Sequence, residues 1–227
     1  MEVLAFRAQL AWRLQRMQIQ PSSMRNNVLP SGVREVESLT LGITRNRRQC
    51  GTWYIPTSTY ANKELLTHLL AWAGWTLQQL GVRLPVTAIT INRGFASRTH
   101  RDASNLGPSL ISTFGQYEGG NLMYWPEDDA SAHVNTLPCA AAVEIDTHCH
   151  GILFDGRRAH ATTGYTGTRM SVVFWCPSDF VSVPRNVWSE LKALGFQVPE
   201  KQPTQAHLST PPLNGHEAHR KLQARHI

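Results

Sequence analysis

Long hydrophobic runs are missing from this sequence of 227 residues. No window approaches the roughly 18 consecutive apolar residues that a transmembrane helix requires. The first residues carry Arg7, Arg13 and Arg16 within an amphipathic pattern, whereas a secretory signal needs a continuous apolar stretch after a basic start. We therefore expect no membrane span and no export, with the protein in the nucleus or the cytoplasm.

Cysteine is scarce and irregularly spaced. The four cysteines are Cys50, Cys139, Cys149 and Cys176, and no two of them form a C-x-x-C pair. This spacing argues against both a zinc ribbon and a disulfide scaffold. A reducing compartment fits it best.

The composition is that of an ordinary globular protein, with 41% hydrophobic and 17% charged residues. A chain of this length accommodates one sizeable core. We expect an N-terminal lead over residues 1–60 packed on the core, a catalytic domain over 61–198 and a flexible tail over 199–227. The net charge of +6 permits a nucleic-acid partner, because Lys and Arg neutralise phosphates.

The order of helical and strand patterns predicts a mainly β fold with flanking helices. A short helical pattern runs through Leu4 and Leu14, and a strong one runs from the candidate N-cap Asn62 to Gly81. After Pro85 the pattern changes to short β-type runs at 86–92, 109–115, 121–125, 141–145, 151–154 and 168–176, separated by turn residues. A final helix is predicted after Pro184. Strands of this number and length are typical of a sandwich or jelly roll.

His100 and Asp102 form an H-x-D triplet in this β region. In an extended strand, residues i and i+2 project from the same face, so both side chains can reach one metal ion. Ferrous iron in oxygenases takes two imidazoles and one carboxylate and leaves positions open for reactants. His160, after the turn at residues 154–156, is the best third ligand. An H-x-D triplet alone recurs by chance, and surface or core histidines are common.

Arg169 and Ser171 strengthen the prediction, because they follow His160 in an alternating strand that places both on one face. A buried guanidinium would bind a dicarboxylate through two hydrogen bonds, and the Ser171 hydroxyl could bind the same group. The alternative is a surface arginine on an edge strand.

The pattern H-x-D, a distant His and R-x-S resembles the Fe(II)/2-oxoglutarate dioxygenase superfamily over residues 85–178. The resemblance implies a double-stranded β-helix, also called a jelly roll or cupin-like fold. It also implies Fe(II), 2-oxoglutarate and O2 as cofactor and co-substrates, with His100, Asp102 and His160 as catalytic metal ligands. Arg169 and Ser171 would bind the far carboxylate of 2-oxoglutarate. The implied reaction converts 2-oxoglutarate to succinate and hydroxylates a C–H bond.

A narrower likeness is to the ten-eleven-translocation and base-J-binding nucleobase oxygenases. The string from His100 to Asn105 looks like their H-R-D-x-x-N, and residues 114–122 look like their G-x-x-x-G-G-x-L hairpin. The resemblance implies that Asn105 contacts a target base and that the substrate is 5-methylcytosine in DNA or RNA. A turn residue is the alternative for Asn105, and the cysteine-rich module of the animal enzymes is missing here.

Two further residues are candidates for binding. Asn92 ends the strand before the metal motif, a strand that faces the co-substrate in relatives, and Arg158 could attract phosphate at the mouth of the site. Solvated positions are the alternative for both. Hydroxylation of a protein side chain or small metabolite, and an inactive binding module with the same fold, are the competing functional hypotheses. The oligomeric state is not predicted.

Overall fold

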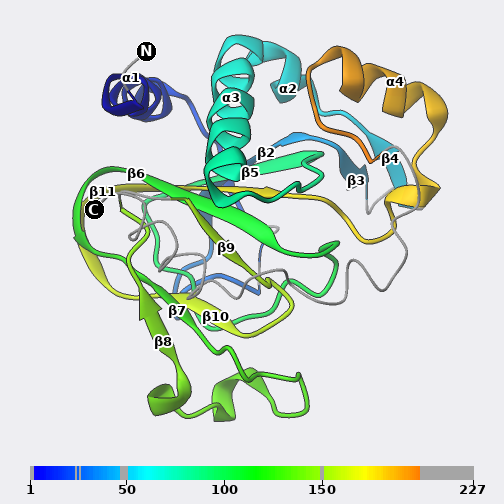
Figure 1. The fold of residues 1–227 in the computed structure, drawn as a ribbon. Helices are drawn as coiled ribbons and strands as arrows, with labels where there is room; N and C mark the ends of the chain where they lie inside the picture. Colours follow the sequence, from blue (N-terminus) through cyan, green and yellow to red (C-terminus); the bar gives the residue numbers. More distant parts are fainter. Residues whose placement is uncertain (1–2, 24, 26, 47–50, 149–150, 200–227) are drawn as a thin grey trace.

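Two antiparallel sheets with a layer of helices above them make up the fold of the computed structural model (Figure 1). The structure describes residues 3–23, 25, 27–46, 51–148 and 151–199. The helices are α1 (Val3–Arg16), α2 (Thr57–Ala61), α3 (Lys63–Leu80) and α4 (Arg185–Ala193), with short 3-10 turns at Val134–Thr136, Cys139–Ala141 and Phe180–Ser182. None of the helices in this part of the chain is long and apolar enough to cross a membrane. Beyond residue 199, the predicted tail lies outside the described residues.

The strands form a large sheet, a small sheet and a separate hairpin. The six-stranded sheet has the order β1 (Pro21–Ser22), β2 (Val36–Gly42), β5 (Ala88–Arg93), β11 (Tyr165–Trp175), β6 (Ser109–Gly119) and β9 (Ile152–Phe154). The three-stranded sheet has the order β10 (His160–Thr162), β7 (Leu122–Tyr124) and β8 (Val143–Ile145). The hairpin pairs β3 (Thr44–Asn46) with β4 (Thr52–Tyr54).

The strand order confirms the predicted double-stranded β-helix. An isolated bridge between His100 and His160 adds the segment around His100 to the small sheet, beside β10. The chain then passes between the two sheets so that β5, β11, β6 and β9 face the His100 segment, β10, β7 and β8. Eight strands in this nested antiparallel order make two Greek keys, the arrangement of a jelly roll.

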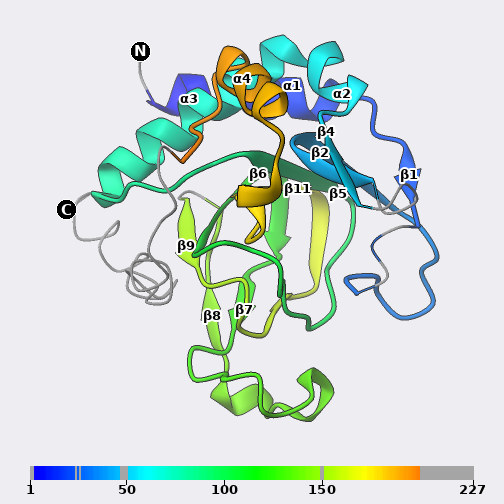
Figure 2. The same cartoon turned by 90° about the vertical axis from the view of Figure 1, so that its right-hand side faces the viewer.

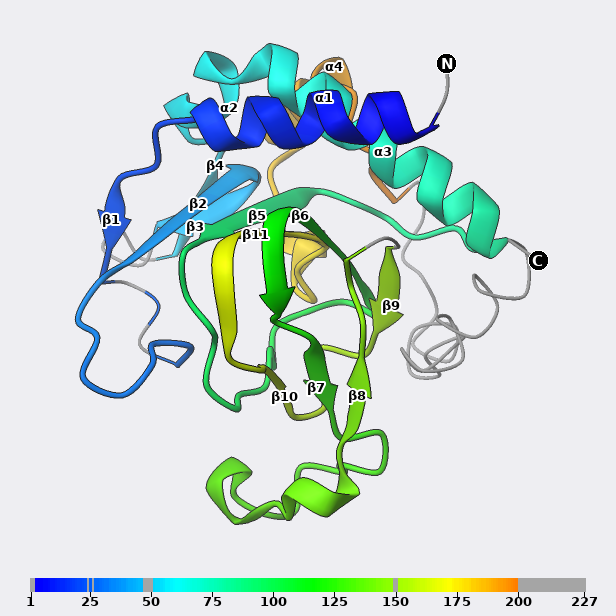
Figure 3. The ribbon, with the colours of Figure 1, turned by 90° about the vertical axis from the view of Figure 1, so that its left-hand side faces the viewer.

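Alternation along β11 explains why one face of the large sheet packs on helices and the other lines a cavity. Met170, Val172 and Phe174 belong to the same buried core as residues of α1 and α3. Ser171 and Val173 point the other way and line the cavity, because successive strand residues project from opposite faces. Figures 2 and 3 show the helices over one face of the sheet, with β7 and β8 on the opposite side.

The N-terminal fifty residues supply a strand of the large sheet that the sequence analysis did not predict. β2 pairs with β5 over residues 37–42, with Ser38 opposite Asn92 and Thr40 opposite Thr90. The predicted first helix is present as α1, and its Leu10 and Leu14 are fully buried. The segment expected as a lead is therefore part of the sheet and its core.

The predicted long helix is present as α3, and its C-terminal end is as expected. Gly81 adopts the left-handed conformation with a φ of 67°, which glycine accommodates without steric cost. At the other end Asn62 occupies the N-cap position, but its side chain does not cap the helix. Instead the Nδ2 atom of the Asn62 side chain donates a hydrogen bond to the backbone carbonyl of Ser58 in α2, 2.8 Å away.

Candidate metal centre

His100 and His160 lie side by side because their backbones pair directly. The amide nitrogen of each donates to the carbonyl oxygen of the other at 3.0 Å. This pairing places the two buried imidazole rings with their centroids 4.1 Å apart. The two histidines are far apart in sequence, but they lie next to each other on two paired segments.

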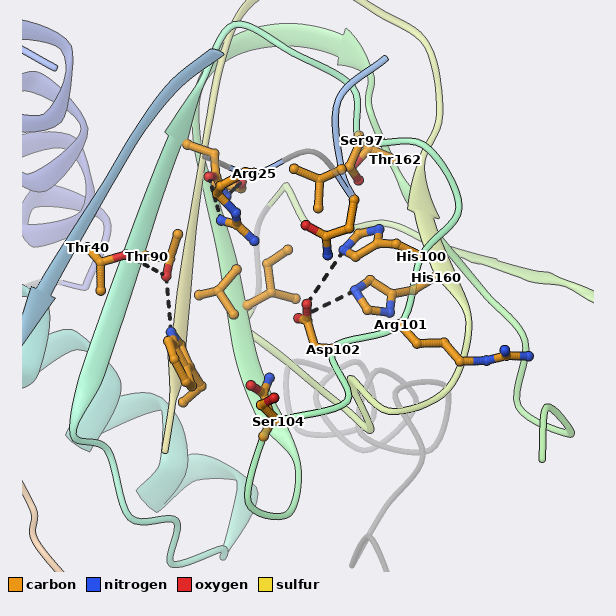
Figure 4. A pocket seen from close by; sticks show the side chains of 18 of the residues that line it. Arg25, Thr40, Thr90, Ser97, His100, Arg101, Asp102, Ser104, His160 and Thr162 are labelled. Atoms are coloured by element: carbon orange, nitrogen blue, oxygen red, sulfur yellow. Dashed lines mark hydrogen bonds and ion pairs between the residues drawn. The ribbon is translucent and has the colours of Figure 1, made fainter. Parts of the chain in front are cut away.

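Asp102 completes a three-residue cluster with the two histidines (Figure 4). Its backbone amide donates to the Gly156 carbonyl at 2.6 Å, which fixes the segment after His100 against the turn before His160. Ligand atoms from the three side chains all lie within 4.8 Å of one another. In the part of the chain that the structure describes, no other such group of His, Cys, Asp or Glu occurs.

Backbone carbonyls fix the orientation of both imidazoles. The Nδ1 atom of His100 lies 2.8 Å from the Arg98 carbonyl oxygen, and that of His160 lies 2.9 Å from the Arg158 carbonyl oxygen. A carbonyl only accepts, so each Nδ1 carries the proton and each Nε2 is free to bind a metal. Both Nε2 atoms lie 3.8 Å from carboxylate oxygens of Asp102.

The His100 imidazole is neutral at neutral pH. Burial first, and then the neighbouring His160, lower the pKa of His100 to about 3, against the opposing effect of the Asp102 charge. Neutral imidazole is the form that ligates metals. Two imidazole nitrogens and one carboxylate within 4.8 Å of one another form a donor set that fits Fe(II), which leaves further coordination positions for other ligands.

Asp128 holds the two ligand-bearing segments together. The Arg101 guanidinium donates to both Asp128 carboxylate oxygens, at 2.7 and 2.5 Å. On the other side, the backbone amide of Ala159 donates to Asp128 Oδ2 at 2.6 Å. Because Arg101 adjoins His100 and Asp102 while Ala159 adjoins His160, this buried carboxylate fixes the spacing of the cluster.

A cavity of about 680 Å³ opens beside the three ligands. Of the predicted binding residues, Asn92, Asn105 and Ser171 line it together with His100, Asp102 and His160. Asn92 and Ser171 are linked by a hydrogen bond of 3.3 Å from the Asn92 amide to the Ser171 hydroxyl. The structure therefore brings together six of the eight residues predicted for the site.

Arg169 is on β11 two residues before Ser171, but it is not among the residues that line this cavity. Its side chain is buried, with the guanidinium 5.6 Å from the Tyr117 ring centroid and 5.7 Å from that of Tyr165. Burial lowers the pKa of Arg169, and its Nε has no hydrogen-bond partner among the described residues. A buried donor without a partner fits the carboxylate of a bound ligand.

Of the two residues predicted to bind substrate, Asn105 lines the cavity and Arg158 does not. The Asn105 amide is buried and donates to the Ser109 hydroxyl at 3.0 Å. Arg158 is about one-third exposed, lies 4.0 Å from the Asp155 carboxylate and does not line the cavity. Its backbone, rather than its side chain, contributes to the centre through the bond to His160.

Sequence reasoning missed three contributors to the site. Asp128 gave no signal, because it lies in a loop rich in acidic and small residues. Tyr117 belongs to the hairpin string already compared with nucleobase oxygenases, so its position beside Arg169 could have been considered. Arg25 lines the cavity from the N-terminal segment, far from every motif in the chain.

Comparisons with known proteins give similarities of fold. No family model matches the chain, and no curated protein matches it. Among solved structures, it is similar to an oxidoreductase of the 2OG-Fe(II) oxygenase family from Burkholderia pseudomallei, with 16% identity, a TM-score of 0.48 and coverage of 74% of this chain and 76% of that one. A Trichoplax adhaerens prolyl hydroxylase bound to a hypoxia inducible factor peptide fragment is 14% identical over 79% and 81% of the two chains, with a TM-score of 0.47. NgTET1 in complex with 5mC DNA is 13% identical over 69% of each chain, with a TM-score of 0.41. The chemistry available to this chain depends on its own residues.

Proposed function

We propose that the chain is an Fe(II)- and 2-oxoglutarate-dependent dioxygenase that hydroxylates a C–H bond. The observation that carries the proposal is the cluster of His100, Asp102 and His160, whose donor atoms lie within 4.8 Å of one another at a cavity. The donor set of two nitrogens and one oxygen suits ferrous iron. A purely structural role would not require two imidazoles oriented by backbone carbonyls beside a carboxylate.

Each residue has a defined part in this proposal. Iron bound with 2-oxoglutarate and O2 supplies the oxidising chemistry that the side chains lack. The carbonyls of Arg98 and Arg158 keep both imidazoles aimed at the metal position. Ser171 presents its hydroxyl to the cavity, and the unpartnered Nε of Arg169 offers a donor for the far carboxylate of the co-substrate. Ile111, Leu122 and Phe154 supply apolar parts of the cavity lining.

For the substrate, we propose a methylated base, 5-methylcytosine in DNA or RNA. Two features support it. The Asn105 side chain lines the cavity beside Asp102, and an amide can pair with a base edge through one donor and one acceptor. The chain also carries a net charge of +6, which favours a polyanion. A base must leave its stack, or come from a single strand, to enter such a cavity.

The test is incubation of the full chain with Fe(II), 2-oxoglutarate and three substrate panels. These panels are single-stranded oligonucleotides with or without 5-methylcytosine, peptides, and small metabolites. We expect succinate release that depends on the methylated oligonucleotide, together with a product heavier by one oxygen atom. Turnover with peptides or metabolites alone would refute the nucleobase but keep the reaction class.

A chain that binds no iron and releases no succinate with any panel would be an inactive binding module. Metal content after anaerobic loading with Fe(II) separates that outcome from a missing substrate. A dioxygenase retains about one iron per chain even when its substrate is absent from the panels, because the three ligands all come from the protein.

A further inference from the structure

Three arginines line the cavity beside the metal ligands, namely Arg25, Arg45 and Arg101. Asp102 is the only carboxylate among the described residues that line it. Two of the cations already have acidic partners, because Arg101 binds Asp128 and Arg45 lies 2.6 Å from the Asp179 carboxylate. Among the described residues, Arg25 forms no ion pair within 4.0 Å, so its charge is the one left uncompensated at close range.

Arg25 is instead held by neutral groups of the sheet. Its Nη1 donates to Asn92 Oδ1 at 3.2 Å and lies 3.5 Å from the Ser38 hydroxyl. The Ser38 hydroxyl also donates to Asn92 Oδ1 at 2.8 Å, and the Asn92 amide donates to Ser171. A continuous chain of hydrogen bonds thus connects Arg25, across β2 and β5, to the β11 hydroxyl expected to bind the co-substrate.

The guanidinium of Arg25 projects into the cavity toward the metal ligands (Figure 4). Burial lowers the pKa of Arg25, and the charge of Asp102 opposes that effect. A partly buried cation that has no ion pair at close range is unfavourable until a ligand supplies a compensating charge. A carboxylate matches the planar, two-pronged guanidinium best.

We propose that Arg25 binds a carboxylate of 2-oxoglutarate in the cavity, as a second arginine besides Arg169. This inference rests on the proposed function. Arg169 lies against Tyr117 and Tyr165 and is not among the residues that line the cavity. A co-substrate with two carboxylates presents two anionic groups. Two arginines lie near Ser171, because Arg169 precedes it by two residues on β11 and Arg25 is connected to it through Asn92. The N-terminal segment therefore contributes to co-substrate binding.

The experiment measures 2-oxoglutarate binding by calorimetry to full-length protein loaded with Mn(II), which replaces Fe(II) without turnover. We expect Arg25→Met to weaken 2-oxoglutarate affinity by about tenfold or more, the usual effect of losing a charged hydrogen bond. Arg25→Lys keeps the positive charge but loses the planar, two-pronged guanidinium. Its affinity for 2-oxoglutarate should lie between those of Arg25→Met and wild type. Arg83→Met is the control, because Arg83 is exposed and does not line the cavity, and its affinity for 2-oxoglutarate should equal that of wild type.

Mn(II) affinity and thermal midpoint should stay at wild-type values in Arg25→Lys, which shows that the fold and metal ligands are intact. Equal 2-oxoglutarate affinity in wild type and both Arg25 variants would overturn the inference while leaving the dioxygenase proposal in place. Loss of oligonucleotide affinity with unchanged 2-oxoglutarate affinity would also overturn it, because Arg25 would then bind phosphate. If wild type itself binds no 2-oxoglutarate, the proposed function and this inference both fail.

Discussion

Each imidazole of the candidate centre is oriented by the carbonyl two residues before it in the chain, Arg98 for His100 and Arg158 for His160. The same local geometry therefore occurs twice, once on each of two paired segments. Because backbone atoms do the orienting, substitution of the Arg98 or Arg158 side chain should leave the rings in place. The Asp102 carboxylate is then the third donor, and only side-chain changes at the ligands themselves remove a donor atom.

Asp102→Ala should abolish metal binding, because it removes the only carboxylate donor of the centre. We expect the affinity for Mn(II) or Fe(II) to fall more than about 100-fold, beyond the range typical of changes outside the ligand set. Metal titration followed by electron paramagnetic resonance measures this. Asp129→Ala, which removes an exposed carboxylate, is the control, and an equal loss in that variant would contradict the assignment.

Asn105→Ala should impair substrate use and spare the co-substrate. The amide lines the cavity but is not a metal ligand, so Fe(II) and 2-oxoglutarate affinities should match wild type. Discrimination for the methylated base should weaken by about 1–3 kcal/mol, the value of a bidentate base contact. Steady-state kinetics measure it with oligonucleotides that carry 5-methylcytosine or thymine at the target position, because the two bases share the methyl group and differ in the edge that an amide contacts. A loss of iron as large as that in Asp102→Ala would refute the role given to Asn105.

Residue patterns predicted the three ligands because their chemistry requires particular side chains at i and i+2 and on a later strand. They could not predict Arg25, since nothing near it in sequence marks a site and its role depends on tertiary contacts with Ser38 and Asn92. The strand face of Arg169 was predicted. Its contacts with Tyr117 and Tyr165 were not, because they depend on the pairing of β6 with β11. The alternation of residues along a strand predicts which face a side chain points to, but it does not predict which side chains it packs against.

At the scale of elements, Asp128 connects the segment of His100 to that of His160 through Arg101 and the Ala159 amide. Asp128→Asn should lower the free energy of unfolding by about 3 kcal/mol, because it leaves a partly buried guanidinium without its counter-charge. Metal affinity should fall as well, since the ligand spacing loosens. Urea unfolding and Mn(II) titration measure the two effects, and Asp129→Asn is the exposed control.

The Asp128 contribution should also depend on pH. Burial raises the pKa of this carboxyl, but hydrogen bonds from Arg101 and from the Ala159 and Ala130 amides outweigh burial and leave the pKa lowered. A carboxyl with a lowered pKa in the folded state stabilises the protein above its unfolded pKa of about 4 and loses that effect as the pH falls. The difference in unfolding free energy between wild type and Asp128→Asn should therefore shrink below about pH 4. A difference that stays constant from neutral to acidic pH would contradict the ion pair.

Gly120, in the turn between β6 and β7, leaves room for the Arg169 side chain. A Cβ there would lie 2.6 Å from Arg169 Cδ and 2.7 Å from its Nε, and the φ of 69° disfavours other residues. Gly120→Ala should cost about 1–3 kcal/mol of stability and weaken 2-oxoglutarate binding, because the guanidinium must move. Gly164→Ala is the matched control, since no atom lies within 4 Å of the Cβ it would add. Unchanged co-substrate affinity in Gly120→Ala would contradict the role of Arg169.

The strands around the metal motif were predicted because their runs of apolar residues are bounded by Gly, Pro and Asp. β2 was missed because its inner face carries Ser38 and Thr40, opposite Asn92 and Thr90. Because these polar residues of β2 face the interior, the strand lacks the usual alternation of buried apolar and exposed polar residues. A strand beside a binding cavity is therefore harder to predict than one beside a packed core.

At the scale of the whole molecule, the two faces of the large sheet have separate tasks. One face packs against α1 and α3 in the main core, and the small sheet lies on the opposite side (Figure 1). The opposite face bounds the cavity together with residues of the small sheet. The fold class followed from the number and order of short strands. Sheet order, and with it the direct pairing of His100 with His160, depends on long-range hydrogen bonds that no local pattern encodes.

The most direct test is a crystal structure of the protein soaked anaerobically in Fe(II), with anomalous diffraction recorded at the iron edge. We predict one anomalous peak, from an iron ion bonded to the Nε2 atoms of His100 and His160 and to the Asp102 carboxylate. An iron peak elsewhere in the molecule, or none between these three side chains, would contradict the metal centre and the dioxygenase proposal that depends on it.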